Sequence, residues 1–325
     1  MTHDALHFDQ SLPAVYGVAQ RLSPRIERLL AHNPSPFTFR GTGVYLIGDH
    51  RRVAVIDPGP NQPEHIAALT AAIGNRQVTD ILITHTHRDH SPAAAPLKRA
   101  TGARTYGYGP HVFYSPSGLR IASAATATSP ASADARGGGG PAIAVVEEGG
   151  DRDFVPDVAV RDGDVIAGEG YRFDCVFTPG HTSNHMCYAL AEEKALFTGD
   201  HVMGWSTTVV APPDGDMGAY MRSLEKLIAR HDRILYPTHG SPVAKPKSFL
   251  RAYLAHRRMR EGQIQRSLMQ GGKTVPELVA ILYAGLKPAL HRAATLTVEA
   301  HLKHMTEDGR IRSQPDGYYE LSVAR

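Results

Sequence analysis

The sequence Thr-His-Thr-His-Arg-Asp-His-Ser at residues 84 to 91 decides the fold, and it directly follows a short apolar run. It places His85, His87, Asp89 and His90 within six residues. A packed apolar core does not need so many polar rings, whereas imidazole and carboxylate groups suit zinc and similar divalent ions. Alternate residues of an extended chain share one face, so His85 and His87 can bind one ion while the other two turn toward a second. The stretch therefore predicts a metal site.

Three later segments repeat this arrangement of a predicted strand that ends at a candidate ligand. The strand at 173–177 is followed by His181, the strand at 195–197 by Asp200, and the strand at 234–236 by His239. Because short apolar strands of one sheet can deliver the residues after them to one edge, we expect these side chains to join the first motif.

The motifs H-x-H-x-D-H, Pro-Gly-His, Gly-Asp and Thr-His-Gly, in this order, resemble the metallo-β-lactamase superfamily over residues 38 to 242 or so. The resemblance implies an α/β fold, an αββα sandwich with helices outside two sheets. It also implies two divalent ions per chain. Seven residues would hold them, with Asp200 shared: His85, His87 and His181 on one ion, and Asp89, His90 and His239 on the other. Zn²⁺ is the first candidate, and Mn²⁺ and iron stay open because the same ligands serve all three.

The resemblance assigns further roles around these ligands. Asp57 matches the first motif of the family and is expected to brace the metal-binding loop, with Thr84 and Thr86 as further supports. Asp89 and His185 are expected to take part in catalysis, since His185 resembles a substrate-facing position of related hydrolases. The sequence identifies no substrate-binding residue.

Two cations in this setting predict a hydrolase. A metal-bound water can ionise near neutral pH because the cation lowers its pKa to about 7, and the hydroxide can attack an ester or thioester carbonyl. No serine or cysteine nucleophile is then needed. The chain has two cysteines, Cys175 and Cys187, and both are expected to be buried and unreactive. With so few cysteines, a disulfide framework is not expected.

Composition favours a soluble enzyme. The chain has 325 residues, of which 42% are hydrophobic, and its formal net charge is +3. We expect no membrane partner, because no apolar run reaches membrane-spanning length. The first residues lack the basic start and apolar run of a secretory signal, so a cytoplasmic location is expected.

The chain divides into two predicted parts. Residues 1–248 form the catalytic domain, and residues 249–325 form a small helical domain that resembles a winged helix. Within the first part, residues 115–150 are expected to be a flexible insertion, since Gly137 to Gly140 are four consecutive glycines in a stretch of small residues. Part of this insertion could instead cover the cleft as a lid.

Local signals in the second part support this division. Thr274 and Glu277 form a capping box that starts a helix. A helical pattern resumes at 297–305, and the segments 310–313 and 318–323 predict a two-strand ribbon. Residues 241 to 325 contain 14 Lys and Arg against 7 Asp and Glu, so this end of the chain is basic.

A winged helix behind such a metal core resembles the β-lactamase-like protein 2 subfamily, which is implicated in cleavage of single-stranded RNA. The seven-ligand pattern is shared with the glyoxalase II branch, whose members hydrolyse thioesters. We favour a small-molecule ester or thioester as substrate. Single-stranded nucleic acid is the alternative, bound by Arg257, Arg258, Arg260, Lys273 and Arg292. A non-enzymatic nucleic-acid-binding regulator is the third class. Winged helices also form dimer contacts, so a homodimer stays open.

Overall fold

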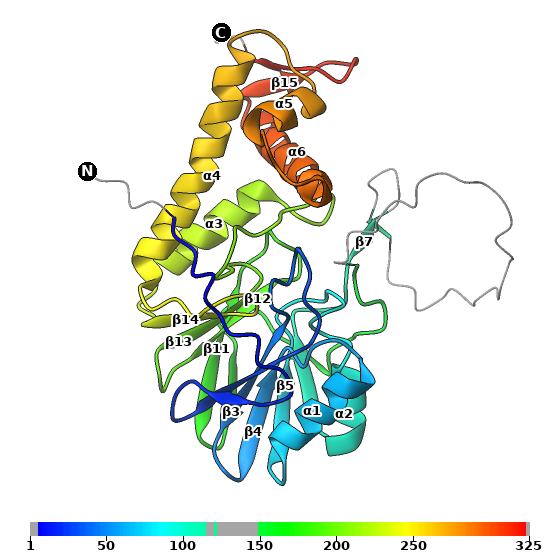
Figure 1. Cartoon of the computed structure of the whole chain (residues 1–325), viewed down its shortest axis with the longest axis vertical. Helices are drawn as coiled ribbons and strands as arrows, with labels where there is room; N and C mark the ends of the chain where they lie inside the picture. The colour runs from blue at the N-terminus through cyan, green and yellow to red at the C-terminus, as the bar shows by residue number, and fades with distance from the viewer. Residues whose placement is uncertain (1–5, 115–119, 122–148, 323–325) are drawn as a thin grey trace, which may run out of the picture.

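The computed structural model describes residues 6–114, 120–121 and 149–322. Two β-sheets are stacked face to face, and helices cover their outer faces (Figure 1). The first sheet has seven strands in the order β1-β2-β3-β4-β5-β6-β9: β1 (Gln20–Arg21), β2 (Ile26–Leu30), β3 (Gly43–Gly48), β4 (Arg52–Ile56), β5 (Gln77–Leu82), β6 (Arg104–Gly107) and β9 (Val158–Ala159). The second has five strands in chain order: β10 (Val165–Gly168), β11 (Tyr171–Phe177), β12 (Met186–Leu190), β13 (Ala195–Gly199) and β14 (Ile234–Pro237).

The core between the sheets is formed by alternate residues of their strands. On β3, Tyr45 and Ile47 face the second sheet, whereas Val44 and Leu46 belong to the cluster under the helices of the first sheet. Both faces of this strand are therefore buried, which explains its nearly continuous apolar sequence. Large rings such as Phe197 fill the space between the sheets.

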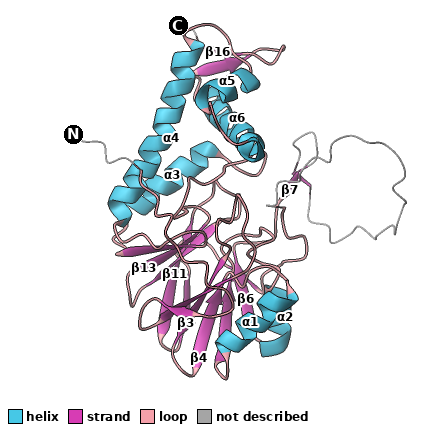
Figure 2. Cartoon of the chain, viewed as in Figure 1, coloured by secondary structure: helices cyan, strands magenta, loops and turns pink. Residues whose placement is uncertain are grey.

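Helices α1 (Pro63–Ile73) and α2 (Ala94–Thr101) lie on the first sheet, while α3 (Met217–Ile228) and the start of α4 (Pro246–Leu268) lie on the second (Figure 2). The predicted αββα sandwich is thus confirmed. The helix expected at residues 63–73 is present, and its proline occupies the first turn, where no backbone hydrogen bond is lost.

Strand direction brings the candidate ligands together. β4 and β5 are parallel, and so are β13 and β14. The segments that leave their carboxyl ends therefore meet at one edge of the sandwich. Gly199 ends β13 with a φ of 49°, and a Cβ there would lie 2.6 Å from His185 Nε2 and 2.7 Å from Thr84 Oγ1. Only glycine allows this close approach.

The C-terminal part contains the end of α4, α5 (Val275–Leu282), a 3₁₀ turn η1 (Pro288–Leu290), α6 (His291–Glu307) and the ribbon of β15 (Ile311–Ser313) and β16 (Tyr319–Leu321). The predicted capping box at Thr274 is present. This part has its own apolar cluster around Leu278, Val298 and Leu302.

Helix α4 was not predicted as one element. It runs for 23 residues and crosses the predicted domain boundary at residue 248. Leu250 and Tyr253 at its start belong to the cluster under the second sheet, and Ile264 and Leu268 near its end belong to the C-terminal cluster. The boundary itself stays a prediction.

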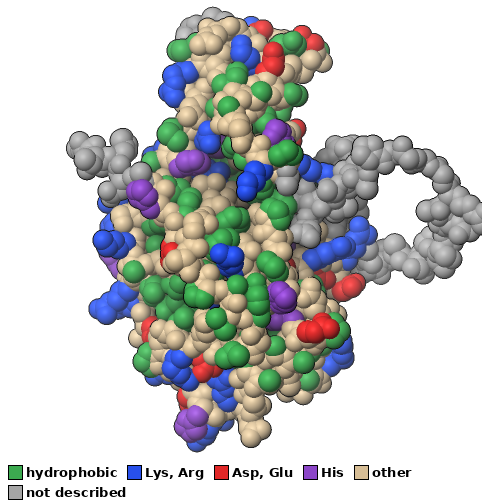
Figure 3. Space-filling view, in the orientation of Figure 1, with side chains coloured by type: hydrophobic (Ala, Val, Ile, Leu, Met, Phe, Trp, Pro, Cys, Tyr) green, Lys and Arg blue, Asp and Glu red, His purple; other side chains and the backbone are tan. Residues whose placement is uncertain are grey.

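The predicted insertion at 115–150 lies almost wholly outside the described residues, apart from the short strand β8 (Arg120–Ile121), which pairs with β7 (Phe113–Tyr114), and Gly149 and Gly150. Among the described residues, no helix is both long and apolar enough to cross a membrane. On the face drawn in Figure 3, Lys and Arg side chains are spread over the molecule and do not gather into one stripe.

Candidate metal centre

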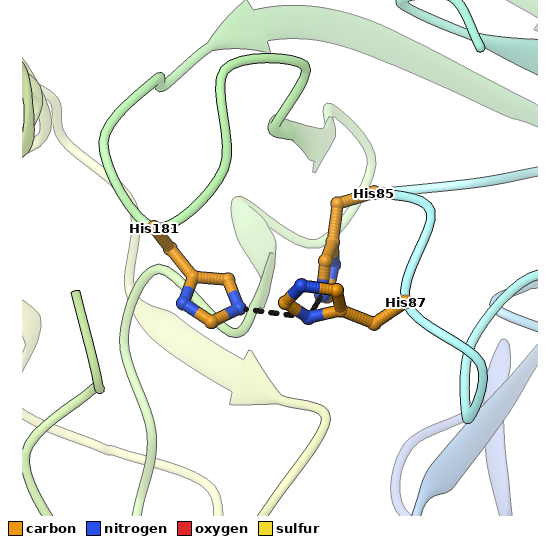
Figure 4. Close-up of side chains that lie close together, drawn as sticks. All are labelled: His85, His87 and His181. Carbon is orange, nitrogen blue, oxygen red and sulfur yellow. Dashed lines mark hydrogen bonds between the residues drawn. The ribbon is translucent and has the colours of Figure 1, made fainter. Parts of the chain in front are cut away.

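Three histidines from two separate loops converge at the edge of the sandwich (Figure 4). His85 and His87 follow β5, and His181 follows β11. His87 Nδ1 lies 2.9 Å from His85 Nε2 and 3.2 Å from His181 Nε2. All three side chains are buried. Neutral imidazoles whose nitrogens face one another in this way form a site for one cation.

A second group lies beside the first. Asp89 Oδ2 is 3.3 Å from His90 Nε2 and 3.2 Å from His239 Nε2. These three ligand atoms lie within 4.8 Å of one another, as do those of the three-histidine group. Asp89 is 17% exposed, whereas the His239 and His90 side chains are 2% and 0% exposed. Solvent therefore reaches this group at Asp89.

Asp200, directly after β13, lies between the two groups. Its Oδ2 is 3.3 Å from His239 Nε2 and 4.0 Å from His181 Nε2. Its Oδ1 is 3.6 Å from His90 Nε2. One carboxylate thus contacts both groups, which is the position that a shared ligand requires.

Unpartnered buried atoms test whether divalent ions fit these residues. His90 Nε2 and Asp200 Oδ1 are buried and have no hydrogen-bond partner. Such atoms are rare in folded proteins and call for an explanation such as an ion. Imidazole nitrogen and carboxylate oxygen are also the donors that zinc prefers. The donor set fits two divalent ions.

The protonation states agree with cation binding. Burial, together with the neighbouring imidazoles, lowers the pKa of His85 and His87 well below the usual histidine value, so both are held in the neutral form that binds metal. Burial alone would raise the pKa of Asp200, but His239 and His90 lower it well below its usual range. Burial opposes protonation of His239, yet Asp200 and Asp89 raise its pKa to about 10. The charged forms of Asp200 and Asp89 are therefore stabilised by positive charge in the candidate metal centre. Metal ions can supply this charge instead of protons.

Asp57 connects the strand ends behind the candidate ligands. Its Oδ1 accepts a hydrogen bond from the Thr84 backbone N–H at 2.8 Å, and its Oδ2 accepts one from Thr84 Oγ1 at 2.7 Å. Asp57 Oδ2 also lies 2.9 Å from His90 Nδ1. Asp57 has a φ of 48°, which is uncommon for a residue with a side chain. This backbone geometry points its carboxylate at the metal-binding loop.

Thr42 is a supporting residue that the sequence analysis missed. Thr42 Oγ1 donates to Asp89 Oδ2 at 2.8 Å, and Asn33 Nδ2 donates to Thr42 Oγ1 at 3.0 Å. Thr42 and Asp89 are 47 positions apart, and a threonine before a strand carries no motif of its own. The loop before β3 therefore fixes the orientation of Asp89.

His185 does not lie where a substrate-facing residue would. Its side chain is fully buried, its Nδ1 contacts Thr178 Oγ1 at 2.9 Å, and its Nε2 accepts the His201 backbone N–H at 3.3 Å. The ring stacks on His85 with centroids 5.2 Å apart. Because both ring nitrogens contact other groups of the protein, this geometry favours support of His85 over the expected catalytic role of His185, which stays a prediction.

Thr86 points away from the ligands. Its Oγ1 accepts a hydrogen bond from Asn184 Nδ2 at 2.8 Å and lies 3.0 Å from His111 Nδ1. Thr86 thus joins the metal-binding loop to the loop that carries His181, rather than supporting a ligand side chain directly. The ligand His181 is itself held through its Nδ1, which lies 2.7 Å from the Val209 carbonyl oxygen. A backbone acceptor of this kind leaves no signal in the sequence.

Comparison with protein families agrees with this geometry. Residues 38–239 match the model of the metallo-beta-lactamase superfamily. The chain belongs to the metallo-beta-lactamase superfamily. Residues 274–318 match the beta-lactamase associated winged helix domain, so the winged helix expected in this superfamily member is confirmed.

Two curated relatives span most of this metallo-beta-lactamase superfamily chain. The lactamase-like protein adaB of Aspergillus niger is 27% identical over 319 residues, which cover 93% of this chain and 86% of the relative. The atrochrysone carboxyl ACP thioesterase of Claviceps purpurea is 28% identical over 295 residues, which cover 88% of this chain and 81% of the relative.

Two solved structures share the fold. A metallo-beta-lactamase family protein from Thermus thermophilus, TTHA1429, has a TM-score of 0.69 and 23% identity, with 93% of this chain and 100% of that chain covered. A beta-lactamase domain protein from Burkholderia ambifaria has a TM-score of 0.73 and 17% identity, with 96% of this chain and 95% of that chain covered.

Proposed function

We propose that the protein is a hydrolase that holds two divalent metal ions, with Zn²⁺ as the first candidate, and cleaves a carboxylic thioester. The observation that carries the proposal is the convergence of two buried ligand groups on Asp200, with unpartnered atoms at His90 Nε2 and Asp200 Oδ1. Relatives that are named ACP thioesterases support the choice of a thioester over other esters.

The chain contributes position and charge to this reaction. When bound, the ions would supply an activated water and polarise the substrate carbonyl. Asp89 is the more exposed of the two carboxylate ligands, and Thr42 fixes its orientation, so it can hold a water at the side where substrate enters. Asp57 and His185 hold the loop and His85 from behind. In the net reaction, water oxygen bonds to the carbonyl carbon, the C–S bond breaks, and a carboxylate, a thiol and a proton are released.

The RNA alternative has less support. Arg257 was expected to contact phosphate from the surface, but its side chain is buried with 1% exposure. Arg258 pairs with Glu225 at 2.6 Å, and the Arg260 guanidinium lies over the Tyr283 ring at 4.5 Å. Arg257 is therefore withdrawn from the outer surface, and Arg258 and Arg260 each contact another side chain of the protein.

The test begins with metal analysis of protein loaded with zinc and dialysed, followed by assays with thioesters, oxygen esters, a β-lactam and single-stranded RNA. We expect close to two ions per chain, and thioester hydrolysis that disappears with a chelator and returns with zinc. RNA cleavage without thioester hydrolysis would overturn the substrate assignment. One ion per chain at saturating zinc would overturn the dinuclear assignment.

A further inference from the structure

A pocket of about 270 Å³ lies between the catalytic core and the C-terminal winged helix. The loop at residues 203–209 and Phe37 form its wall on the core side. Tyr283, Leu290 and Ala293 are among the residues that form the opposite wall. The lining is mostly apolar and includes the polar residues Ser206, Thr207 and Thr208. The two parts of the chain together line this space, which is partly open to solvent.

The pocket shares a wall with the candidate metal centre. Thr208 Oγ1 donates to the Asp200 carbonyl oxygen at 2.8 Å. The Val209 carbonyl oxygen lies 2.7 Å from His181 Nδ1. Thr208 and Val209 therefore contact the ligand residues on one side and line the pocket on the other. The pocket therefore adjoins the candidate metal centre.

Arg257 adds a buried positive charge to the pocket lining. Its guanidinium NH2 donates to the Thr208 carbonyl oxygen, while its Nε is buried without a hydrogen-bond partner. The guanidinium lies 5.1 Å from the centre of the Tyr220 ring, and no described Asp or Glu forms an ion pair with it. Burial of a charge without a counter-ion is costly, so such a group is retained where it meets an acceptor.

We propose that this pocket binds the acyl group of the substrate, a group of about two fused rings that carries an oxygen, and that Arg257 recognises that oxygen. The inference rests on the proposed thioester hydrolysis and names the class of acyl group. An apolar cavity of about 150 Å³ holds one benzene ring, so a pocket of about 270 Å³ fits two. The winged helix thereby selects the substrate, while the ligands remain in the core.

The first test fills the pocket from the winged-helix side. Leu290→Trp is compared with Ile281→Trp, which places the same side chain at an exposed position of α5 outside the pocket. The substrates are N-acetylcysteamine thioesters of acetate and of a hydroxynaphthoate. We expect Leu290→Trp to lower kcat/KM for the hydroxynaphthoyl thioester by about tenfold or more, as expected when a bulky group loses its pocket. The acetyl thioester should stay within about twofold of wild type. Equal losses with both substrates, or none, overturn the pocket assignment.

The second test separates recognition by Arg257 from a structural role. Wild type and Arg257→Met are assayed with naphthoyl and hydroxynaphthoyl thioesters. Since a hydrogen bond to a charged group accounts for roughly a tenfold preference or more, the preference of the wild type for the hydroxylated substrate should vanish in the variant. A preference that survives in Arg257→Met overturns the role of Arg257, because damage to folding would lower both rates together.

A binding measurement distinguishes failure of the pocket from failure of the thioester proposal. Zinc-loaded wild type, Leu290→Trp and Ile281→Trp are titrated calorimetrically with hydroxynaphthoic acid. We expect wild type and Ile281→Trp to bind the acid and Leu290→Trp to bind it at least about tenfold more weakly. If this binding pattern is observed but no thioester is hydrolysed, the proposed function is wrong and the proposal that the pocket binds the aromatic group is retained. Equal binding by all three proteins overturns the pocket.

Discussion

Among the residues that the structure describes, one buried cluster of histidine and carboxylate lies at the strand ends and another lies in the C-terminal part. In the second, Glu261 Oε1 lies 2.8 Å from His304 Nδ1 and 3.3 Å from His301 Nδ1, and Glu261 Oε2 accepts from Arg310 at 2.7 Å. By residue type alone, both clusters resemble metal sites. Within the described residues, only the strand-end cluster brings three or more ligand atoms to within 4.8 Å of one another.

The difference lies in where the positive charge comes from. Arg310 belongs to the Glu261 cluster and forms ion pairs with Glu261 and with the more exposed Asp308. At the strand ends, the ion pairs of Asp57, Asp89 and Asp200 among described residues involve histidines alone, without a Lys or Arg. A cluster with its own guanidinium carries a permanent positive charge, whereas acidic groups that meet only imidazoles can take their positive charge from metal ions.

Replacement of Asp200 should produce the largest effect. We expect Asp200→Ala to hold at most one ion per chain and to lower kcat roughly 10³-fold, because the shared ligand is lost. Metal analysis and thioester kinetics measure both effects. Glu261→Gln is the matched control and should keep two ions and full activity. Two tightly bound ions in Asp200→Ala would contradict the assignment of the strand-end cluster as the metal centre.

Glu261→Gln should instead reduce stability. The substitution replaces a carboxylate by an uncharged amide and so removes the buried negative charge that Arg310 and His304 contact. We therefore expect the free energy of unfolding to fall by about 3 kcal/mol. Urea unfolding of the zinc-loaded protein measures this loss. Loss of metal with unchanged stability would show that the Glu261 cluster is the metal site.

Acid should remove the stabilisation of the fold that ionised Glu261 provides. Burial would raise the pKa of Glu261, but hydrogen bonds from His301, Arg310 and His304 lower it to about 2. A lowered carboxylate pKa stabilises the fold fully above the unfolded value near 4.5 and loses this effect as pH falls toward 2. The stability difference between wild type and Glu261→Gln should therefore shrink across this window. A difference that is constant from pH 5 to 2.5, measured by urea unfolding, would rule out this linkage.

Thr42→Val should weaken the metal centre moderately. The substitution keeps the shape of the side chain and removes the hydrogen bond to Asp89. Loss of a group that orients a ligand typically lowers metal affinity by about 10- to 100-fold. Competition with a zinc chelator measures this change. Thr79→Val, which removes a hydroxyl outside the centre, should leave zinc affinity unchanged.

Arg258→Ala should have the smallest effect. Both partners of its ion pair with Glu225 are exposed, at 62% and 48%, and pairs of this kind contribute about 0 to 1 kcal/mol. The KM for a small thioester should change little with salt in wild type and in this variant. A KM that rises steeply with ionic strength, less so in Arg258→Ala, would indicate a phosphate-rich substrate.

The sequence predicted the ligands because each follows a short apolar strand in a local motif. The residues that support these ligands were harder to predict, because the hydrogen bond from Thr42 to Asp89 joins two segments that are far apart in the sequence. His185 shares a motif with His181, but the motif does not reveal that its ring faces inward.

Prediction failed most clearly at α4. No side chain caps its start at Lys245, and its apolar residues serve two clusters, so no single helical stripe stands out. Arg257 lies among other arginines and therefore resembled a surface residue. Burial of one arginine in such a run depends on which side of the helix meets the core, and that is set by tertiary packing.

The continuous helix α4 also constrains how related sequences can change. Tyr253 is fixed in the core, where its hydroxyl accepts from the Thr208 backbone N–H at 2.9 Å, and Ile264 is fixed in the winged helix. Each residue of an α-helix turns the chain by about 100° and advances it by about 1.5 Å. Insertion or deletion of one residue between these positions would therefore rotate the winged helix away from its seat on α3. This segment should tolerate changes of residue type far more readily than changes of length.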